Sequence, residues 1–223
     1  MSINVAIDGP AGAGKSTIAR MLAKELDYIY VDTGAMYRAM ALYMIEQKTD
    51  IENMDAVRSA CDVITIDIRY SNGEQQVILN GKNVNGFIRT EAVSEMSSKI
   101  SAIPEVREKL LSLQRSLASA ENVIMDGRDI GTHVLPNADV KIFLTADAHV
   151  RAVRRYEEFI AKGISCTLDG VEKEVVERDE RDMNRAVAPL KQAEDAVRVD
   201  TSDMTIQEVV CYLKALIERA VSR

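Results

Sequence analysis

The sequence predicts an α/β fold, and three observations carry this prediction. Residues 3–8 form a short apolar run, residues 9–14 are small and glycine-rich, and residues 15–26 place apolar side chains at helical spacing. Short apolar segments then alternate with helical patterns along the chain, which is typical of strands in a parallel sheet. Residues 63–80 instead show a two-residue repeat, which indicates a small antiparallel insertion outside that sheet.

The elements of the main fold follow from hydrophobic periodicity. In the first helix, Ile18, Met21, Leu22 and Leu26 make one apolar stripe. Short strands are expected at residues 3–8, 28–31, 123–126, 140–144 and 197–200. Helices are expected at residues 15–26, 34–46, 90–120 with a break at 103–104, 147–162 and 171–186, and after a capping box at 205–208.

The insertion is predicted from alternation and from two turn signals. Residues 64–68 alternate apolar and polar side chains, as in a half-buried antiparallel strand. Asn72-Gly73 predicts a hairpin turn, and residues 77–79 predict the returning strand. Asn80-Gly81 predicts a second turn, towards Val84.

Composition excludes several classes of protein. Of the 223 residues, 47% are hydrophobic and 28% are charged, as in a folded domain and unlike a disordered or fibrous chain. The net charge of −7 argues against general nucleic-acid binding, which needs a positive field. No apolar run approaches the roughly 18 residues of a membrane span, so we expect neither a membrane anchor nor export.

The cysteines and histidines predict no metal or disulfide site. Cys61, Cys166 and Cys211 are scattered and odd in number, so they indicate neither a disulfide framework nor a metal-binding pair. They fit a reducing, cytoplasmic compartment. His133 and His149 belong to no cluster of ligands, so no zinc site is expected.

The glycine-rich loop carries the most specific motif. Residues 9–16 match G-x-x-x-x-G-K-[ST], the signature of a phosphate-binding loop. Glycines let backbone N–H groups point inward, Lys15 reaches the outer phosphates, and Ser16 offers its hydroxyl to magnesium. The residues expected to bind the nucleotide are Gly9, Pro10, Ala11, Gly12, Ala13, Gly14, Lys15, Ser16 and Thr17.

Phosphate loops occur in switches, motors and kinases, so other motifs must distinguish these classes. A GTPase switch needs an N-K-x-D motif, which the sequence lacks, and a D-x-x-G motif after a strand. Residues 126–129 read D-G-R-D and end in aspartate instead. The switch interpretation is therefore disfavoured.

Arginines near the strand ends predict a second anion site. Arg38 lies about one turn into the helix that follows the second strand, and Arg128 follows a later strand, at the edge where α/β proteins gather ligands. Arg178, Arg181 and Arg185 are spaced by three and four residues, so we expect them on one face of a helix.

That arginine-rich helix also has a simpler interpretation. Glutamates four residues before Arg178 and Arg181 could form ion pairs on a solvated face. Arg151 and Arg155 repeat the spacing on the preceding helix, so two arginine faces could close over a transferring phosphoryl group. Because the phosphate loop is present, the functional interpretation is favoured.

The motifs resemble those of the P-loop nucleoside monophosphate kinases, and among them the bacterial cytidylate kinases. The resembling blocks lie at residues 9–17, 32–38, 126–131, 141–144 and 177–190. The resemblance implies a five-stranded parallel sheet of order 2-3-1-4-5, with helices on both faces, a short lid and the antiparallel β insertion. It divides one domain into a core (about 1–32, 121–150 and 186–223), a monophosphate-binding region (about 33–120) and a lid region (about 151–185).

The resemblance also implies transfer of the γ-phosphoryl group of ATP to CMP or dCMP, in pyrimidine metabolism, with magnesium bound at Ser16 partly through water. Matching positions place Arg38, Arg128 and Arg185 at the acceptor phosphate, Asp182 at the ribose, and Ser98, Arg107 and Asp129 at the base, with Thr33 also binding substrate. The implied catalytic residues are Lys15, Arg128, Arg151, Arg155, Arg178 and Arg181. Thr33 stands where some relatives carry serine, which preserves the hydroxyl group.

Two other functions stay open at this point. One is a different small-molecule P-loop kinase, acting on another monophosphate or on an alcohol. The other is a nucleotide-sensing protein without turnover. The sequence shows no obvious partner surface, so we expect a monomer.

Overall fold

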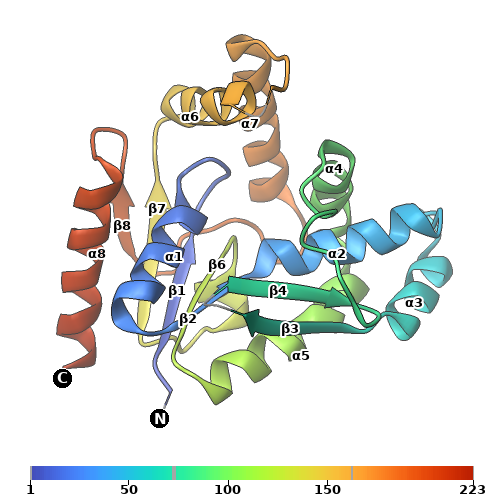
Figure 1. The fold of residues 1–223 in the computed structure, drawn as a ribbon, viewed down its shortest axis with the longest axis horizontal. Coiled ribbons are helices and arrows are strands. Elements are labelled where there is room, and N and C mark those ends of the chain that lie inside the picture. The colour runs from blue at the N-terminus through green and yellow to red at the C-terminus, as the bar shows by residue number, and fades with distance from the viewer. Residues whose placement is uncertain (1, 72–73, 162, 223) are drawn as a thin grey trace. The chain divides into compact units, whose positions relative to one another are not determined.

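The computed structural model describes residues 2–71, 74–161 and 163–222. Its contacts divide the chain into two compact units, which we call unit 1 (Met1–Tyr30 and Glu121–Arg223) and unit 2 (Val31–Ala120). Figure 1 shows their elements. The division into core, monophosphate-binding and lid regions remains a prediction about function.

The main sheet has five parallel strands. In spatial order they are β2 (Ile29–Asp32), β6 (Val123–Gly127), β1 (Asn4–Asp8), β7 (Val140–Thr145) and β8 (Val197–Asp200). Counted along the chain within this sheet, the order is 2-3-1-4-5, so the prediction is confirmed. The register places Asp8 beside Gly127 on one side and Phe143 on the other, so the carboxyl ends of three strands meet at one edge. This edge is where α/β proteins bind ligands.

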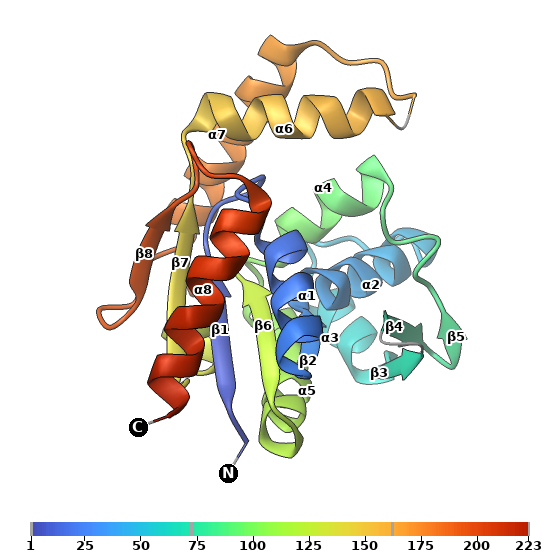
Figure 2. The same ribbon diagram turned by 60° about the vertical axis from the view of Figure 1, so that its left-hand side comes forward.

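Helices α1 (Lys15–Leu26) and α8 (Ile206–Val221) lie on the same side of this sheet in unit 1 (Figure 2). Ile18 and Leu22 of α1 are buried in one core with Val210 and Leu213 of α8 and with strand residues. The apolar stripe expected in the first helix is therefore its buried face. Thr205 begins α8 as the N-cap of the predicted capping box.

Helices α6 (Ala148–Ala161) and α7 (Leu168–Asn184) pack against each other in unit 1. Ala152 of α6 contributes to a small apolar core with Val171 and Val175 of α7. Helix α7 begins earlier than expected because the Thr167 side chain caps it, accepting a hydrogen bond from Gly170 N. A short π-helical segment, η1 (Ile130–Val134), follows β6 and is not predicted by the sequence analysis.

Unit 2 contains helices and the antiparallel insertion. Its elements are α2 (Thr33–Glu46), α3 (Met54–Val63), β3 (Ile66–Ser71), β4 (Glu74–Leu79), β5 (Lys82–Asn83), α4 (Glu91–Ile100) and α5 (Pro104–Ala120). The three short strands form a sheet of their own, and β3 and β4 are antiparallel, with Ile66 opposite Leu79. The predicted insertion is confirmed, and Asn72-Gly73 lies outside the described residues.

Helix α3 is missing from the sequence-based prediction. Asn53 caps it by accepting hydrogen bonds from Asp55 N and Ala56 N, and Val57 and Cys61 face inward at helical spacing. A spacing of four residues between two buried positions is a helical signal, but only a short one.

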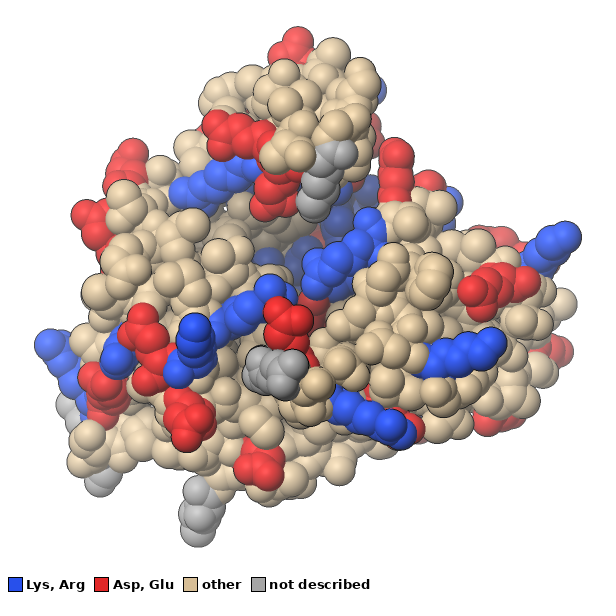
Figure 3. Space-filling model, in the orientation of Figure 1, with Lys and Arg blue, Asp and Glu red and all other residues tan. Residues whose placement is uncertain are grey.

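Charged side chains lie on the surface of the protein (Figure 3), and its cysteines are unpaired. Among the described residues, no helix combines the length and the apolar character that crossing a bilayer requires. Figure 3 shows acidic and basic side chains interspersed on one face of the molecule. All three cysteines are free thiols, and Cys61 is the buried one.

Candidate active site

The phosphate loop joins β1 to α1 in unit 1. At Gly9 the backbone has φ +148°, and a Cβ atom there would lie 1.9 Å from the carbonyl oxygen of Leu144, so a side chain is excluded. Gly14, with φ 83°, caps the N-terminus of α1. Free N–H groups and the helix dipole make such a terminus an anion-binding site.

Lys15 is buried at the start of α1. Its Nζ donates a hydrogen bond to the Pro10 carbonyl oxygen at 2.6 Å. Burial lowers the pKa of Lys15 well below its ordinary value, and Arg128 lowers it further, while Asp126 and Asp8 act in the opposite direction. A phosphate group would stabilise this desolvated cation.

The sequence predicts no separate role for Asp126, which follows the apolar part of β6. Its Oδ2 accepts a hydrogen bond from Ser16 Oγ at 2.8 Å, and its Oδ1 accepts one from Tyr30 Oη at 3.0 Å. A carboxylate and a hydroxyl are the oxygen ligands that Mg²⁺ prefers, so Ser16 and Asp126 fit a magnesium site. The signal for Asp126 is its place beside glycine at the end of a core strand, as for Asp8.

Two arginine–carboxylate pairs follow β6. Arg128 Nε donates to Asp182 Oδ2 at 2.9 Å, and Arg185 Nη2 donates to Asp129 Oδ1 at 3.2 Å. Burial raises the pKa of Asp182, but Arg128, Arg178 and Arg185 outweigh burial, and the net shift is downward. The structure thus brings together residues that are 54 and 56 positions apart in the sequence.

Arg178 adds a half-buried cation beside these pairs. Within the described residues, its Nε is buried and has no hydrogen-bond partner. Burial, followed by repulsion from Arg128, lowers the pKa of Arg178 to about 10. Arg155 on α6 also repels Arg178, and its own guanidinium pairs with Glu174 at 3.0 Å and stacks on Phe159. This group therefore carries positive charge that the protein leaves partly uncompensated.

Arg151 is buried and bonds to protein acceptors with all of its guanidinium nitrogens. Nη2 pairs with Asp179 at 2.7 Å, Nη1 donates to the Ala11 carbonyl oxygen at 2.9 Å, and Nε donates to the Ala146 carbonyl oxygen at 2.9 Å. Arg151 thereby ties the phosphate loop to α6 and α7.

The expectation that three arginines share one face of α7 is wrong. Arg181 is exposed, and its Nε donates to the Glu177 carbonyl oxygen at 3.3 Å. Arg185 lies beyond the end of the helix in extended conformation, because α7 ends at Asn184. The ion pairs considered for Arg178 and Arg181 are replaced by others, since Glu174 pairs with Arg155 and Glu177 with Lys173.

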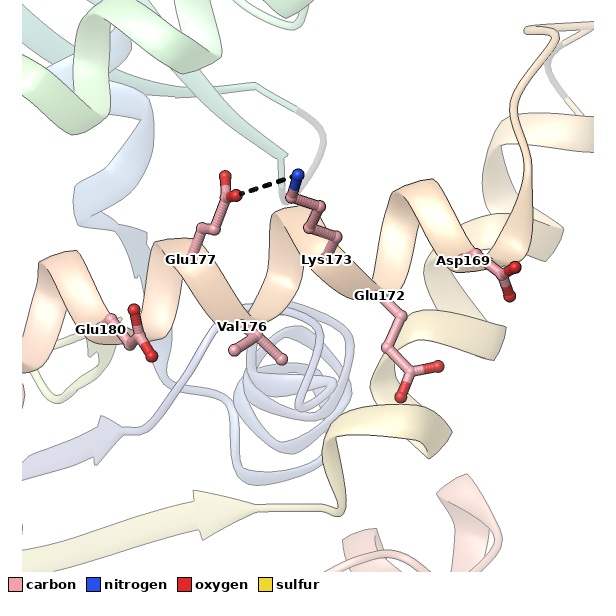
Figure 4. A pocket seen from close by; sticks show the side chains of 6 residues that line it. All are labelled: Asp169, Glu172, Lys173, Val176, Glu177 and Glu180. Carbon is pink, nitrogen blue, oxygen red and sulfur yellow. Dashed lines mark ion pairs between the residues drawn. The ribbon is translucent and has the colours of Figure 1, made fainter.

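The outward face of α7 is acidic. A shallow pocket on it is lined by Asp169, Glu172, Lys173, Val176, Glu177 and Glu180 (Figure 4). These side chains stand along a single helix, and the Lys173–Glu177 pair is long, at 3.9 Å. The pocket holds no residue of the predicted site.

In unit 2, Asp32 organises the start of α2. Its Oδ1 accepts from Ala35 N at 2.8 Å, and its Oδ2 pairs with Arg38 at 3.0 Å and with Arg89 at 3.5 Å. Thr33 is buried next to it. The carboxylate caps the helix and holds the Arg38 side chain that the sequence predicts at an acceptor phosphate.

Ser98 and Arg107 are connected through one residue of unit 2. The Ser98 carbonyl oxygen accepts from Ser101 Oγ at 2.8 Å, and the Ser101 carbonyl oxygen accepts from Arg107 Nη1 at 3.1 Å. Arg107 is buried and lies over the Tyr37 ring, 5.8 Å from its centroid. The predicted base-binding residues of this unit therefore adjoin the segment that carries Arg38.

Comparison with known proteins identifies the family of the chain. Cytidylate kinase of Carboxydothermus hydrogenoformans is 48% identical over 97% of this chain and 98% of its own length. Cytidylate kinase of Bacillus cytotoxicus is 46% identical over 99% of this chain and 98% of its own. An uncharacterized protein from Eubacterium ventriosum has a similar fold, with a TM-score of 0.53 and 13% identity, covering 98% of this chain and 99% of that one. The family model described as cytidylate kinase matches residues 5–219, and the chain therefore belongs to the cytidylate kinase family.

Proposed function

We propose that this protein transfers the γ-phosphoryl group of ATP to CMP or dCMP, producing ADP and CDP or dCDP. Family membership and one structural observation support this proposal. Beside a phosphate-binding loop, burial, Arg128 and Arg178 lower the pKa of Lys15, and burial and Arg128 lower the pKa of Arg178. Such a cluster favours a ligand rich in phosphate charge.

The donor side of the reaction uses the phosphate loop. Residues 9–17 would bind the ATP phosphates through backbone N–H groups, with Lys15 at the β and γ groups. Ser16 and Asp126 would hold Mg²⁺, directly or through water, which supplies charge neutralisation when bound. Arg151 keeps the loop in place through the Ala11 carbonyl oxygen.

Acceptor-binding residues are proposed for each unit separately. In unit 1, Arg128 and Arg185 would bind the acceptor phosphate, while Asp182 would accept from the ribose and Asp129 from the base. In unit 2, the proposed residues are Thr33, Arg38, Ser98 and Arg107. The carboxylates paired with Arg38, Arg128 and Arg185 orient these guanidinium groups before the acceptor binds, which reduces the entropy lost on binding.

The transfer needs no general base, because the attacking oxygen belongs to an ionised phosphate. A bond forms between that oxygen and the γ phosphorus, while the bond from the γ phosphorus to the β–γ bridging oxygen breaks, and ADP leaves. Arg178 and Arg155 would stabilise the charge that spreads over the transferring group. Catalysis then consists of alignment and electrostatic stabilisation.

An ADP-release assay with purified protein tests the proposal. The acceptor panel is CMP, dCMP, UMP, AMP, GMP and shikimate, with a no-acceptor control. We expect turnover with CMP and dCMP well above that with the others. Preference for another acceptor would indicate a different small-molecule kinase, and ATP binding without turnover would indicate a sensor.

Base selectivity is tested by Asp129→Ala. Cytosine presents a donor at N4 where uracil presents an acceptor, so a carboxylate favours cytosine. A mismatched or unpaired buried group costs about 1–3 kcal/mol. We expect CMP turnover to fall more than UMP turnover, whereas a parallel fall would assign Asp129 to loop structure.

The remaining expectations concern location and assembly. A cytoplasmic location, a monomeric state and the lack of a nucleic-acid partner are part of the proposal. Gel filtration with light scattering at micromolar concentration measures the oligomeric state directly.

A further inference from the structure

Asp8 is a buried carboxylate that the proposed reaction does not use. It is the last residue of β1, is 4% exposed, and directly precedes Gly9 of the phosphate loop. Its Oδ1 accepts from Ile130 N at 2.7 Å, and its Oδ2 accepts from Gly131 N at 2.7 Å. The carboxylate therefore binds a segment more than a hundred residues away in the sequence.

That segment needs an external acceptor. The backbone hydrogen bonds of η1 start with His133 N and Val134 N, which both donate to the Asp129 carbonyl oxygen. The N–H groups of Ile130 and Gly131 precede these donors and are left over, as at the start of any helix. Both residues are buried, and an unpaired buried N–H costs about 1–3 kcal/mol. Asp8 accepts from both.

The same residue also fixes the other end of the Arg128-Asp129 dipeptide. Gly127, immediately before it, is the register partner of Asp8 in the β1–β6 pair. Ile130, immediately after it, is held by the Asp8 side chain. Arg128 and Asp129 are thus bracketed on both sides by one residue, and that residue adjoins the phosphate loop.

We infer that Asp8 is a positioning residue, which fixes the positions of Arg128 and Asp129 relative to the phosphate loop. Selectivity between CMP and UMP depends on these positions. The inference rests on the proposed function. Asp8 acts through backbone amides and does not touch either substrate. A carboxylate suits this role because both of its oxygens accept hydrogen bonds. An amide of the same shape accepts with one oxygen only.

Gly131 offers an independent way to disturb the same contact. A Cβ atom there would lie 3.1 Å from Lys141 Cδ and 3.4 Å from Asp8 Oδ2. Alanine would therefore crowd the Lys141 side chain and press the segment that Asp8 holds, without changing the carboxylate.

The experiment measures kcat/KM for CMP and UMP, first in the wild type and then in Asp8→Asn. The variant places an NH₂ group against one of the two N–H donors, so the segment shifts. We expect the ratio of kcat/KM for CMP to kcat/KM for UMP to fall by about tenfold or more. The decrease in kcat for CMP should be larger than the increase in KM for ATP. The matched control is Asp139→Asn, because Asp139 accepts from Asn4 N at 2.8 Å at the opposite end of β1. In Asp139→Asn, the ratio of kcat/KM for CMP to kcat/KM for UMP should stay at the wild-type value.

Each outcome decides one question. A wild type that fails to phosphorylate CMP contradicts the proposed function, whatever Asp8 does. An active wild type with an unchanged ratio in Asp8→Asn, or with equal losses for both acceptors, overturns the inference and leaves Asp8 a purely structural residue. If Asp8→Asn does not fold, the same ratio is measured in Gly131→Ala, where narrowing supports the inference and an unchanged ratio refutes it.

Discussion

Helix α7 presents two faces whose charges differ in their surroundings. On one face Asp179 and Asp182 are buried, each paired with an arginine of another segment, and Arg178 is desolvated beside them. On the other face Glu177 and Glu180, which Figure 4 shows along the helix, are exposed. Charges in a low-dielectric setting interact strongly, whereas exposed ion pairs contribute about 0–1 kcal/mol. We therefore expect the buried charges, rather than the exposed ones, to serve the proposed reaction.

The largest expected effect extends this comparison to the buried cation of the phosphate loop. Lys15→Ala should fold normally and lower kcat for CMP phosphorylation by at least about a thousandfold, because it removes the charge that we propose to face the β and γ phosphates. Steady-state kinetics with circular dichroism as the folding control checks this. A folded variant with unchanged turnover would falsify the kinase proposal.

The contribution of the buried Asp8 carboxyl group to the stability of the folded protein depends on pH. Burial raises its pKa from 3.8 to about 6, against the hydrogen bonds from Gly131 and Ile130; Asp129 raises it further and Lys15 lowers it. Because the folded-state pKa lies above the unfolded value, Asp8 contributes stability that is complete below pH 3.8 and is lost as pH rises through about 6.

Asp8→Asn removes that titration. Between pH 4 and 8, the free energy of unfolding of the variant should gain up to about 3 kcal/mol relative to the wild type. Urea unfolding of both proteins at each pH measures the difference. A constant difference across this range would show that the Asp8 pKa is unshifted.

Arg178 and Arg181 test the comparison within one turn of α7. We expect Arg178→Ala to lower kcat by about a hundredfold, with a smaller change in KM for CMP, because a desolvated guanidinium acts most on charge that develops in the transition state. The exposed Arg181 should lose less than about tenfold when replaced by alanine. Equal losses in the two variants would break the link between burial and function.

The smallest effect is expected on the outward face of α7. Glu177→Gln combined with Glu180→Gln should change the free energy of unfolding by no more than about 0.5 kcal/mol and kcat by less than about twofold. Thermal unfolding and the ADP-release assay measure both. A tenfold loss of kcat would give this acidic face a role that its exposure does not suggest.

The fold was largely predictable because its signals are local. The glycine loop between strand and helix and the two-residue repeat at 64–68 depend on residues close together in the chain, and the structure contains both. Helix α3 escaped prediction because its buried positions are few, and η1 because its first amide groups are held by Asp8 from another strand. Contacts of that range leave no periodic trace in the sequence.

The same distinction between local and long-range information applies to the residues of the candidate site. The sequence alone determined the part of the site that consists of consecutive residues. This part is the phosphate loop with Lys15 and Ser16, because the backbone geometry of the loop follows from its glycines. The tertiary structure decided which charges are desolvated and which partners they take: Asp126 on Ser16, Asp182 on Arg128, and Arg181 left in solvent. Spacing by three and four residues cannot determine this, since α7 ends at Asn184 and the side chains that surround each arginine come from distant segments. Burial depends on what packs against a residue, and only the folded chain specifies that.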